Sequence, residues 1–327
     1  MNPERLAQLV KSHFDDLAPR YGMESPGVST ERMVNSGSVE RRSYTITDGT
    51  ITYHLKLARS PRSVGKLSKW HSLRRILHER YGAPEIVDWI DIPGSGFSGL
   101  LCERVPGRAA DLASPRLTRE IVALVSQLHT DEELRAMLRP LVTEGSCADY
   151  FNGVWIRRFK EDLALIDAQP PAFLASETLE WMKTEALAIE RAVAGMEAFS
   201  GRASSPAHGD LWSDNILVAD DGRWRIVDWD DLALGDPALE FAIILEQVLD
   251  HNPDASPAEM FPHGPDAGFS QRLEVCLRAQ RLYSAIEGAA EYIEADALEE
   301  GSDSFREERK ARHQVAVRSY TLRYGAG

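Results

Sequence analysis

The feature that most constrains this 327-residue chain is a polar loop followed by a short hairpin. The loop reads His-Gly-Asp-Leu-Trp-Ser-Asp-Asn over residues 208–215, and two apolar runs then flank an Asp-Gly pair at 221–222. An Asp-Gly pair in this position is a strong hairpin signal, so the second strand returns beside the first. The return brings Asp228 near Asp210 and Asn215. Such a cluster suits a hard divalent cation and leaves one carboxylate to accept a proton.

The spacing of these residues is H-x-D-x4-N, followed thirteen positions later by an aspartate at a strand end. This pattern resembles the catalytic loop and metal-binding aspartate of the protein-kinase-like fold. The match is closer to the aminoglycoside phosphotransferase and choline kinase superfamily, which favours H-G-D and continues with I-D-W-x-D and G-D-P. The chain reads V-D-W-D-D at 227–231 and G-D-P at 235–237.

The resemblance implies an α+β, bilobal fold with two domains. A small antiparallel-sheet lobe, residues 1–106, would bind the nucleotide, and a larger, mainly helical lobe, residues 107–327, would carry the catalytic loop and the acceptor site. The Pro-Gly pair at 106–107 marks the boundary.

Hydrophobic periodicity agrees with this division. Strands are expected at 43–47, 50–57, 85–92 and 100–105, with helices at 2–20 and 66–81. Beyond the boundary the pattern is helical, over 117–128, 150–166, 179–199, 239–249, 269–295 and 305–324.

One lysine in the second expected strand faces away from its apolar neighbours. Residues 51, 53, 55 and 57 are apolar and point one way, so Lys56 points the other way. Taken alone, this is a solvated strand lysine. The resemblance instead makes it a contact for the nucleotide phosphates. It also assigns nucleotide contacts to the turn Ser36, Gly37 and Ser38, and to the hinge residues Glu103 and Val105.

The expected partner of Lys56 is absent. Kinases of this fold pair the lysine with a glutamate on the next helix, but the first acid in the helix at 66–81 is Glu79, near its far end. Either the partner comes from elsewhere, with Glu40 and Glu79 as candidates, or the pairing is replaced.

The resemblance also assigns catalytic roles. Asp210 would accept the proton of the acceptor hydroxyl, His208 would orient the loop, and Asp236 would bond to the loop backbone. Asn215 and Asp228 would hold Mg²⁺, which prefers oxygen ligands. The predicted function is transfer of the γ-phosphate of ATP or GTP to a hydroxyl of an aminoglycoside-like or other small acceptor, with positioning and electrostatics as the main catalytic effects.

Acidic residues beyond the metal site bear on the acceptor. They are Asp230, Asp231, Glu287, Glu291 and Glu294, and the last three share one helical face. Either they form a pocket for a cationic, amine-bearing acceptor, or they are a solvated acidic face.

Composition excludes several other classes of protein. A net charge of −14 opposes a nucleic-acid partner, since such binding rests on clustered Lys and Arg. No apolar run approaches the roughly 20 residues that span a bilayer, and the amino terminus lacks a signal-peptide plan, so a cytoplasmic protein without a membrane partner is expected.

The three cysteines are far apart and are expected to be buried free thiols. Monomer and homodimer both remain open.

Two other functions remain as alternatives. One is a pseudokinase that binds nucleotide without efficient catalysis, suggested by the missing helix glutamate. The other is a hydrolase or glycosyltransferase with a D-x-D metal site at 228–230. This second alternative leaves Lys56 and the hinge unexplained.

Overall fold

The computed structural model describes residues 3–30, 41–261, 264, 266–295 and 302–325. The chain forms two compact units. Unit 1 contains Met1–Ala110 and Ser213–Leu232, and unit 2 contains Asp111–Trp212 and Ala233–Gly327. The hairpin therefore groups with the amino-terminal residues, whereas Asp210 belongs to the helical unit. The division at residue 106 into a nucleotide lobe and an acceptor lobe stays a prediction.

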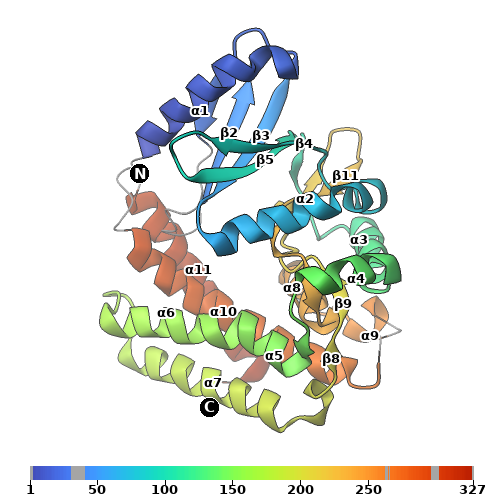
Figure 1. Ribbon diagram of the computed structural model, residues 1–327. Helices are drawn as coiled ribbons and strands as arrows, with labels where there is room; N and C mark the ends of the chain where they lie inside the picture. The colour runs from blue at the N-terminus through green and yellow to red at the C-terminus, as the bar shows by residue number, and fades with distance from the viewer. Residues whose placement is uncertain (1–2, 31–40, 262–263, 265, 296–301, 326–327) are drawn as a thin grey trace. The chain divides into compact units, whose positions relative to one another are not determined.

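Unit 1 is built on a five-stranded antiparallel sheet with the order β1-β2-β3-β5-β4 (Figure 1). Its strands are β1 (Gly27–Thr30), β2 (Arg41–Thr47), β3 (Thr52–Ala58), β4 (Ile86–Ile92) and β5 (Phe97–Glu103). The four predicted strands are confirmed, with ends that shift by at most three residues. Strand β1 has only four residues, three of them exposed, and was not predicted.

Two helices cover opposite faces of this sheet. Helix α1 (Pro3–Leu17) packs Leu6, Val10 and Phe14 against inward residues of β2 to β5, including Leu55. Side chains alternate along a strand, so Lys56 lies on the other face, where helix α2 (Pro61–Tyr81) packs.

Helix α2 begins five residues before the predicted start. The hydroxyl of Ser60 accepts a hydrogen bond from the backbone N–H of Ser63, and Pro61 occupies the first turn, where its fixed φ suits a helix. Gly82 ends the helix with a φ of 65°, a conformation that glycine adopts without strain.

The predicted hairpin is also confirmed. Strand β10 (Ile216–Val218) pairs antiparallel with β11 (Trp224–Ile226) on one side and with β6 (Arg108–Ala109) on the other. The turn closes through a 2.8 Å bond from the N–H of Ala219 to the carbonyl of Arg223, and Gly222 has a φ of 81°.

Unit 2 is mainly helical. Its helices are α3 (Pro115–His129), α4 (Glu132–Leu138), α5 (Cys147–Phe151), α6 (Arg157–Ala168), α7 (Ser176–Gly195), α8 (Pro237–His251), α9 (Pro257–Met260), α10 (Phe269–Glu294) and α11 (Ser302–Tyr324). Two short strand pairs, β7 (Gly145–Ser146) with β8 (Arg202–Ala203) and β9 (Ser205–Ala207) with β12 (Ala233–Gly235), were not predicted. The helix predicted at 150–166 is divided by a π-helical turn, Asn152–Ile156.

Helix α10 is the centre of unit 2. It packs against α6, α7, α8 and α11 (Figure 1). Most of its residues are buried. A helix enclosed by others loses the one-sided apolar pattern of a surface helix, and its sequence carries buried Arg272, Gln280 and Arg281 among apolar residues. The three cysteines are buried free thiols, as predicted.

Candidate active site

A cavity of about 340 Å³ lies within unit 1. Strands β2, β3 and β5, helix α2, the segment after β5 and the β10–β11 hairpin all contribute to it. Its lining is Ser43, His54, Lys56, Trp70, Pro84, Cys102, Glu103, Arg104, Val105, Gly107, Asn215, Leu217, Val227 and Asp228. Five predicted site residues therefore share one cavity, although they come from positions as far apart as 56 and 228.

Lys56 lies in the centre of β3, between Ser43 on β2 and Leu100 on β5. Its Nζ is 2.6 Å from Oδ1 of Asp228 and 3.1 Å from Oδ2 of Asp230. Burial opposes the positive charge, but the two carboxylates outweigh it and raise the pKa of Lys56. The lysine is thus held as an ammonium ion inside the cavity.

Asn215 and Asp228 are brought together by the hairpin. Ile216 pairs with Ile226, and the backbone N–H of Val227 donates to the carbonyl of Asn215 over 2.9 Å. Asp228 has φ 61° and ψ 57°, and it is the one non-glycine residue with positive φ in the described part of the chain. This conformation is strained for an L-residue and is concentrated at functional sites.

The hinge residues Glu103 and Val105 line the same cavity. The carboxylate of Glu103 accepts hydrogen bonds from the guanidinium of Arg225 and from the backbone N–H of Glu85, the latter over 2.7 Å. These contacts hold the side chain of Glu103, and the backbone N–H groups of Glu103 and Arg104 donate to the carbonyls of Glu85 and Thr52. The contact of this segment with a base stays a prediction. The predicted phosphate turn, Ser36, Gly37 and Ser38, lies outside the described residues.

Residues 208–212 of the predicted catalytic loop belong to unit 2, and helix α8 of the same unit holds them. The Gly209 N–H donates to Oε1 of Glu240 over 2.8 Å, and Oε2 of Glu240 lies 2.7 Å from Nε2 of His129. His208 is fully buried, and its Nδ1 accepts a 3.3 Å bond from the N–H of Asp210. This contact is of the kind that the orienting role predicted for His208 requires.

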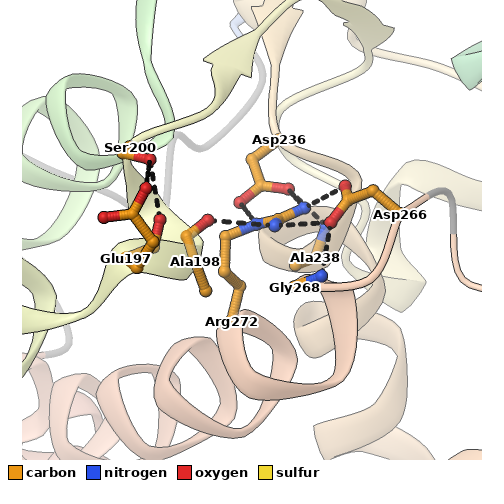
Figure 2. Close-up of polar contacts among 8 residues, drawn as sticks. All are labelled: Glu197, Ala198, Ser200, Asp236, Ala238, Asp266, Gly268 and Arg272. Carbon is orange, nitrogen blue, oxygen red and sulfur yellow. Dashed lines mark hydrogen bonds and ion pairs between the residues drawn. The ribbon is translucent and has the colours of Figure 1, made fainter.

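Asp236 differs from its expected contact. It was expected to bond to the loop backbone, but its carboxylate caps α8 through the N–H of Ala238 and binds Arg272, as Figure 2 shows. Arg272 donates to the Asp236 carboxylate from Nε and Nη2. Its Nη1 and Nη2 atoms both donate to Asp266, and Nη1 also donates to the carbonyl of Ala198. The backbone contact falls instead to Glu240, one helical turn later.

The five acids predicted for the acceptor fall into two groups. Asp230 and Asp231 are in unit 1, where Asp230 contacts Lys56 and Asp231 contacts Lys66. The other three, Glu287, Glu291 and Glu294, lie on α10 in unit 2.

Arginines of α11 partly neutralise the α10 group. Glu287 is 2.7 Å from Arg312, and Glu291 is 3.0 Å from Arg309. Asp162 on α6 joins the group: burial, together with the charges of Glu287 and Glu294, raises its pKa to about 6. No acceptor role was predicted for Asp162, because a single acid on an amphipathic helix carries no signal in the sequence.

The residues in unit 1 fit a magnesium ion bound with a nucleotide. Mg²⁺ takes one or two protein carboxylates and completes its shell with phosphates and water, and Asn215 and Asp228 supply oxygen atoms in the same cavity as Lys56. In the described ranges, no three His, Cys, Asp or Glu side chains surround a common metal position.

The sequence model of the phosphotransferase enzyme family matches residues 32–275. The chain belongs to this family. The catalytic loop, the hairpin and the G-D-P segment all lie within the match, and so does every predicted site residue except the three acids of α10. The expectation of a phosphotransferase is thereby confirmed.

Solved structures confirm the protein-kinase-like fold. The GDP and kanamycin complex of APH(2")-IIia is 13% identical, covering 94% of this chain and 99% of that one, with a TM-score of 0.61. Choline kinase LicA from Streptococcus pneumoniae is 15% identical, covering 97% and 99%, at 0.58. Spectinomycin phosphotransferase APH(9)-Ia, in complex with ADP and spectinomycin, is 14% identical, covering 96% and 94%, at 0.58.

A comparison with curated protein sequences gave no match. No helix in the described ranges is long and apolar enough to cross a membrane.

Proposed function

We propose that this phosphotransferase transfers the γ-phosphate of ATP or GTP to a hydroxyl group of a small acceptor. The observation that carries the proposal is the cavity in unit 1, which gathers Lys56, Asn215, Asp228 and the hinge segment around a volume of about 340 Å³. An ammonium ion, a pair of oxygen donors and the backbone of the hinge segment are groups that could serve phosphates, a metal ion and a base.

Each side chain has a definite part in this proposal. Asn215 and Asp228 would hold Mg²⁺, and when bound this ion neutralises charge on the phosphates. Lys56 would contact the phosphate oxygens as a permanently charged donor. Asp210 would take the proton of the acceptor hydroxyl, on a loop kept in place by His208 and Glu240.

The acceptor is proposed to be an aminoglycoside-like or other amine-bearing compound. Support comes from the acids of α6 and α10: burial first, and the nearby charges of Glu287 and Glu294 second, raise the pKa of Asp162. The kanamycin and spectinomycin complexes of two structural neighbours are consistent with an amine-bearing acceptor in this fold. Arg158 acts on Asp162, and Arg309 and Arg312 pair with Glu291 and Glu287, so these arginines reduce the negative charge of the proposed subsite.

The test is a coupled assay of the purified protein with ATP-magnesium and with GTP-magnesium. The panel contains hydroxyl-bearing metabolites and antibiotics, arranged in pairs that differ by one amine. We expect nucleotide-dependent phosphorylation of an amine-bearing member and slower turnover of its neutral counterpart.

Other results of the assay would contradict the proposal. A protein that binds neither nucleotide would overturn it. Nucleotide binding without phosphorylation of any acceptor would favour the pseudokinase alternative. Equal turnover of neutral and amine-bearing partners would refute the acceptor class alone.

A further inference from the structure

Helix α2 does not supply a carboxylate to Lys56. The structure describes this helix in full, and its single acid, Glu79, lies near Arg75 at 3.9 Å. From α2, Trp70 approaches Lys56 with its ring centroid 5.7 Å from the ammonium nitrogen. The carboxylate that fixes the lysine therefore comes from outside α2.

The two carboxylates that contact Lys56 differ in their surroundings. The side chain of Asp228 is 40% exposed and lines the large cavity, whereas that of Asp230 is 4% exposed and does not line it. Asp228 can thus turn toward a ligand in the large cavity, while Asp230 contacts the lysine from a smaller cavity of about 80 Å³ that both carboxylates line with Lys56.

The backbone that carries Asp230 is fixed on both sides. The preceding residue, Trp229, is fully buried, donates from Nε1 to the carbonyl of Ile226 over 3.0 Å, and packs on Tyr81 of α2 at a ring distance of 6.1 Å. The following residue, Asp231, is bound by Lys66. A short 3₁₀ turn, Trp229–Asp231, therefore holds the Asp230 carboxylate in one place.

A buried ammonium ion needs a charged partner, because desolvation without one is costly. If Asp228 alone held Lys56, a metal ion that recruited Asp228 would leave the lysine without a carboxylate. Asp230 removes this conflict. One carboxylate is available to the metal, and the other stays with the lysine.

We propose that Asp230 is the positioning residue of Lys56, and that it keeps the ammonium ion directed into the cavity when Asp228 binds a metal. The segment that carries Asp228 thus also provides the carboxylate partner of the lysine, which in the kinases that this sequence resembles comes from a helix. The inference rests on the proposed function for its catalytic meaning, but the Lys56–Asp230 contact can be tested without a nucleotide.

The first experiment measures nucleotide binding by calorimetry in the presence of magnesium. The Asp230→Asn variant should bind ATP-magnesium or GTP-magnesium about 10- to 100-fold more weakly, which is the loss seen when the partner that orients a metal-binding side chain is removed. The exposed hairpin variant Asp221→Asn is the control and should bind as the wild type does. A melting curve checks that both variants are folded. Unchanged affinity in folded Asp230→Asn would overturn the inference.

The second experiment needs no nucleotide, so it separates failure of the inference from failure of the proposed function. The ammonium protons of a lysine give a sharp ¹H–¹⁵N signal only when fixed acceptors slow their exchange with water. In an Asp228→Asn background, which mimics a recruited Asp228, the Lys56 signal should persist. The Lys56 signal should also persist in the Asp228→Asn, Asp221→Asn double variant. It should disappear in the Asp228→Asn, Asp230→Asn double variant. Loss in Asp228→Asn alone, or persistence in the Asp228→Asn, Asp230→Asn double variant, would refute the positioning role.

Discussion

The Nε atom of Arg272 lies 2.8 Å from Oδ2 of Asp236, and the two side chains are only 4% and 2% exposed. Asp236 caps the first turn of α8, and the same helix carries Glu240, which binds the catalytic loop at Gly209. One buried ion pair therefore fixes the start of the helix that positions the loop (Figure 2). Asp266, half exposed, occupies the outer side of the same guanidinium.

We expect Arg272→Met to lower the free energy of unfolding by about 3–5 kcal/mol, because it leaves the Asp236 carboxylate buried without its cation. Asp266→Asn removes only the exposed partner and should cost about 1 kcal/mol or less. Urea denaturation of the two variants beside the wild type measures the difference. Similar losses in both would show that burial does not control the strength of this pair.

The two carboxylates predicted for catalysis should affect turnover far more than stability. Asp210→Ala removes the proposed base and should lower turnover by about 10²- to 10⁴-fold, the usual contribution of general base catalysis. Asp228→Ala should be at least as severe, since it removes a proposed metal ligand. Steady-state rates are compared with melting temperatures, which should stay near that of the wild type. Near-normal turnover in either variant would contradict its assignment.

Glu240 offers a separate test of loop positioning. Glu240→Ala removes the acceptor for the N–H of Gly209 and the partner of His129, so the loop that carries Asp210 shifts. We expect turnover to fall by about 10²-fold, which is the effect of a displacement near 1 Å at a reacting group. Nucleotide affinity should change less than turnover, because Gly209 itself does not line the cavity of unit 1.

The conservative variant Glu240→Gln keeps one carbonyl oxygen for Gly209 and should retain more activity than Glu240→Ala. Weaker nucleotide binding in both variants, with unchanged turnover at saturation, would argue against a role in positioning the loop.

Sequence alone was informative where local signals set the structure. The Asp-Gly turn predicted the hairpin that joins Asn215 to Asp228, and the strand alternation placed Lys56 on the face opposite α1. Contacts between distant segments left no such signal. The partner of Lys56 lies in a loop more than 170 residues away, a separation that no helix or strand period can report.

The roles of polar residues in the helical unit could not be predicted from the sequence for a different reason. Glu240 sits in an apolar segment that reads simply as a buried helix, and Asp162 resembles any other charge on an amphipathic one. The left-handed backbone of Asp228 was also beyond prediction, since that conformation is rare for aspartate and is imposed here by the surrounding fold.

The last prediction concerns pH and a fully buried acid on α8. Burial, followed by the charge of Asp250, raises the pKa of Glu246 to about 7, against the opposing effects of Arg281, Ser284 and Gln280 on α10. The folded protein therefore keeps a proton that the unfolded chain releases near its ordinary pKa of 4.5. Stability from this group is complete below that pH, declines as the pH rises toward 7, and is constant above it.

Glu246→Gln mimics the protonated acid, so the variant should gain on the wild type as the pH rises. The expected gain between pH 4.5 and pH 8 is on the order of 3 kcal/mol. Urea unfolding across this range measures it, and Glu259→Gln on the exposed surface of α9 serves as the matched control, with a profile parallel to that of the wild type. If the curves of Glu246→Gln and the wild type stay parallel, Glu246 does not titrate in the folded protein over this range, and its raised pKa is excluded as a source of pH dependence.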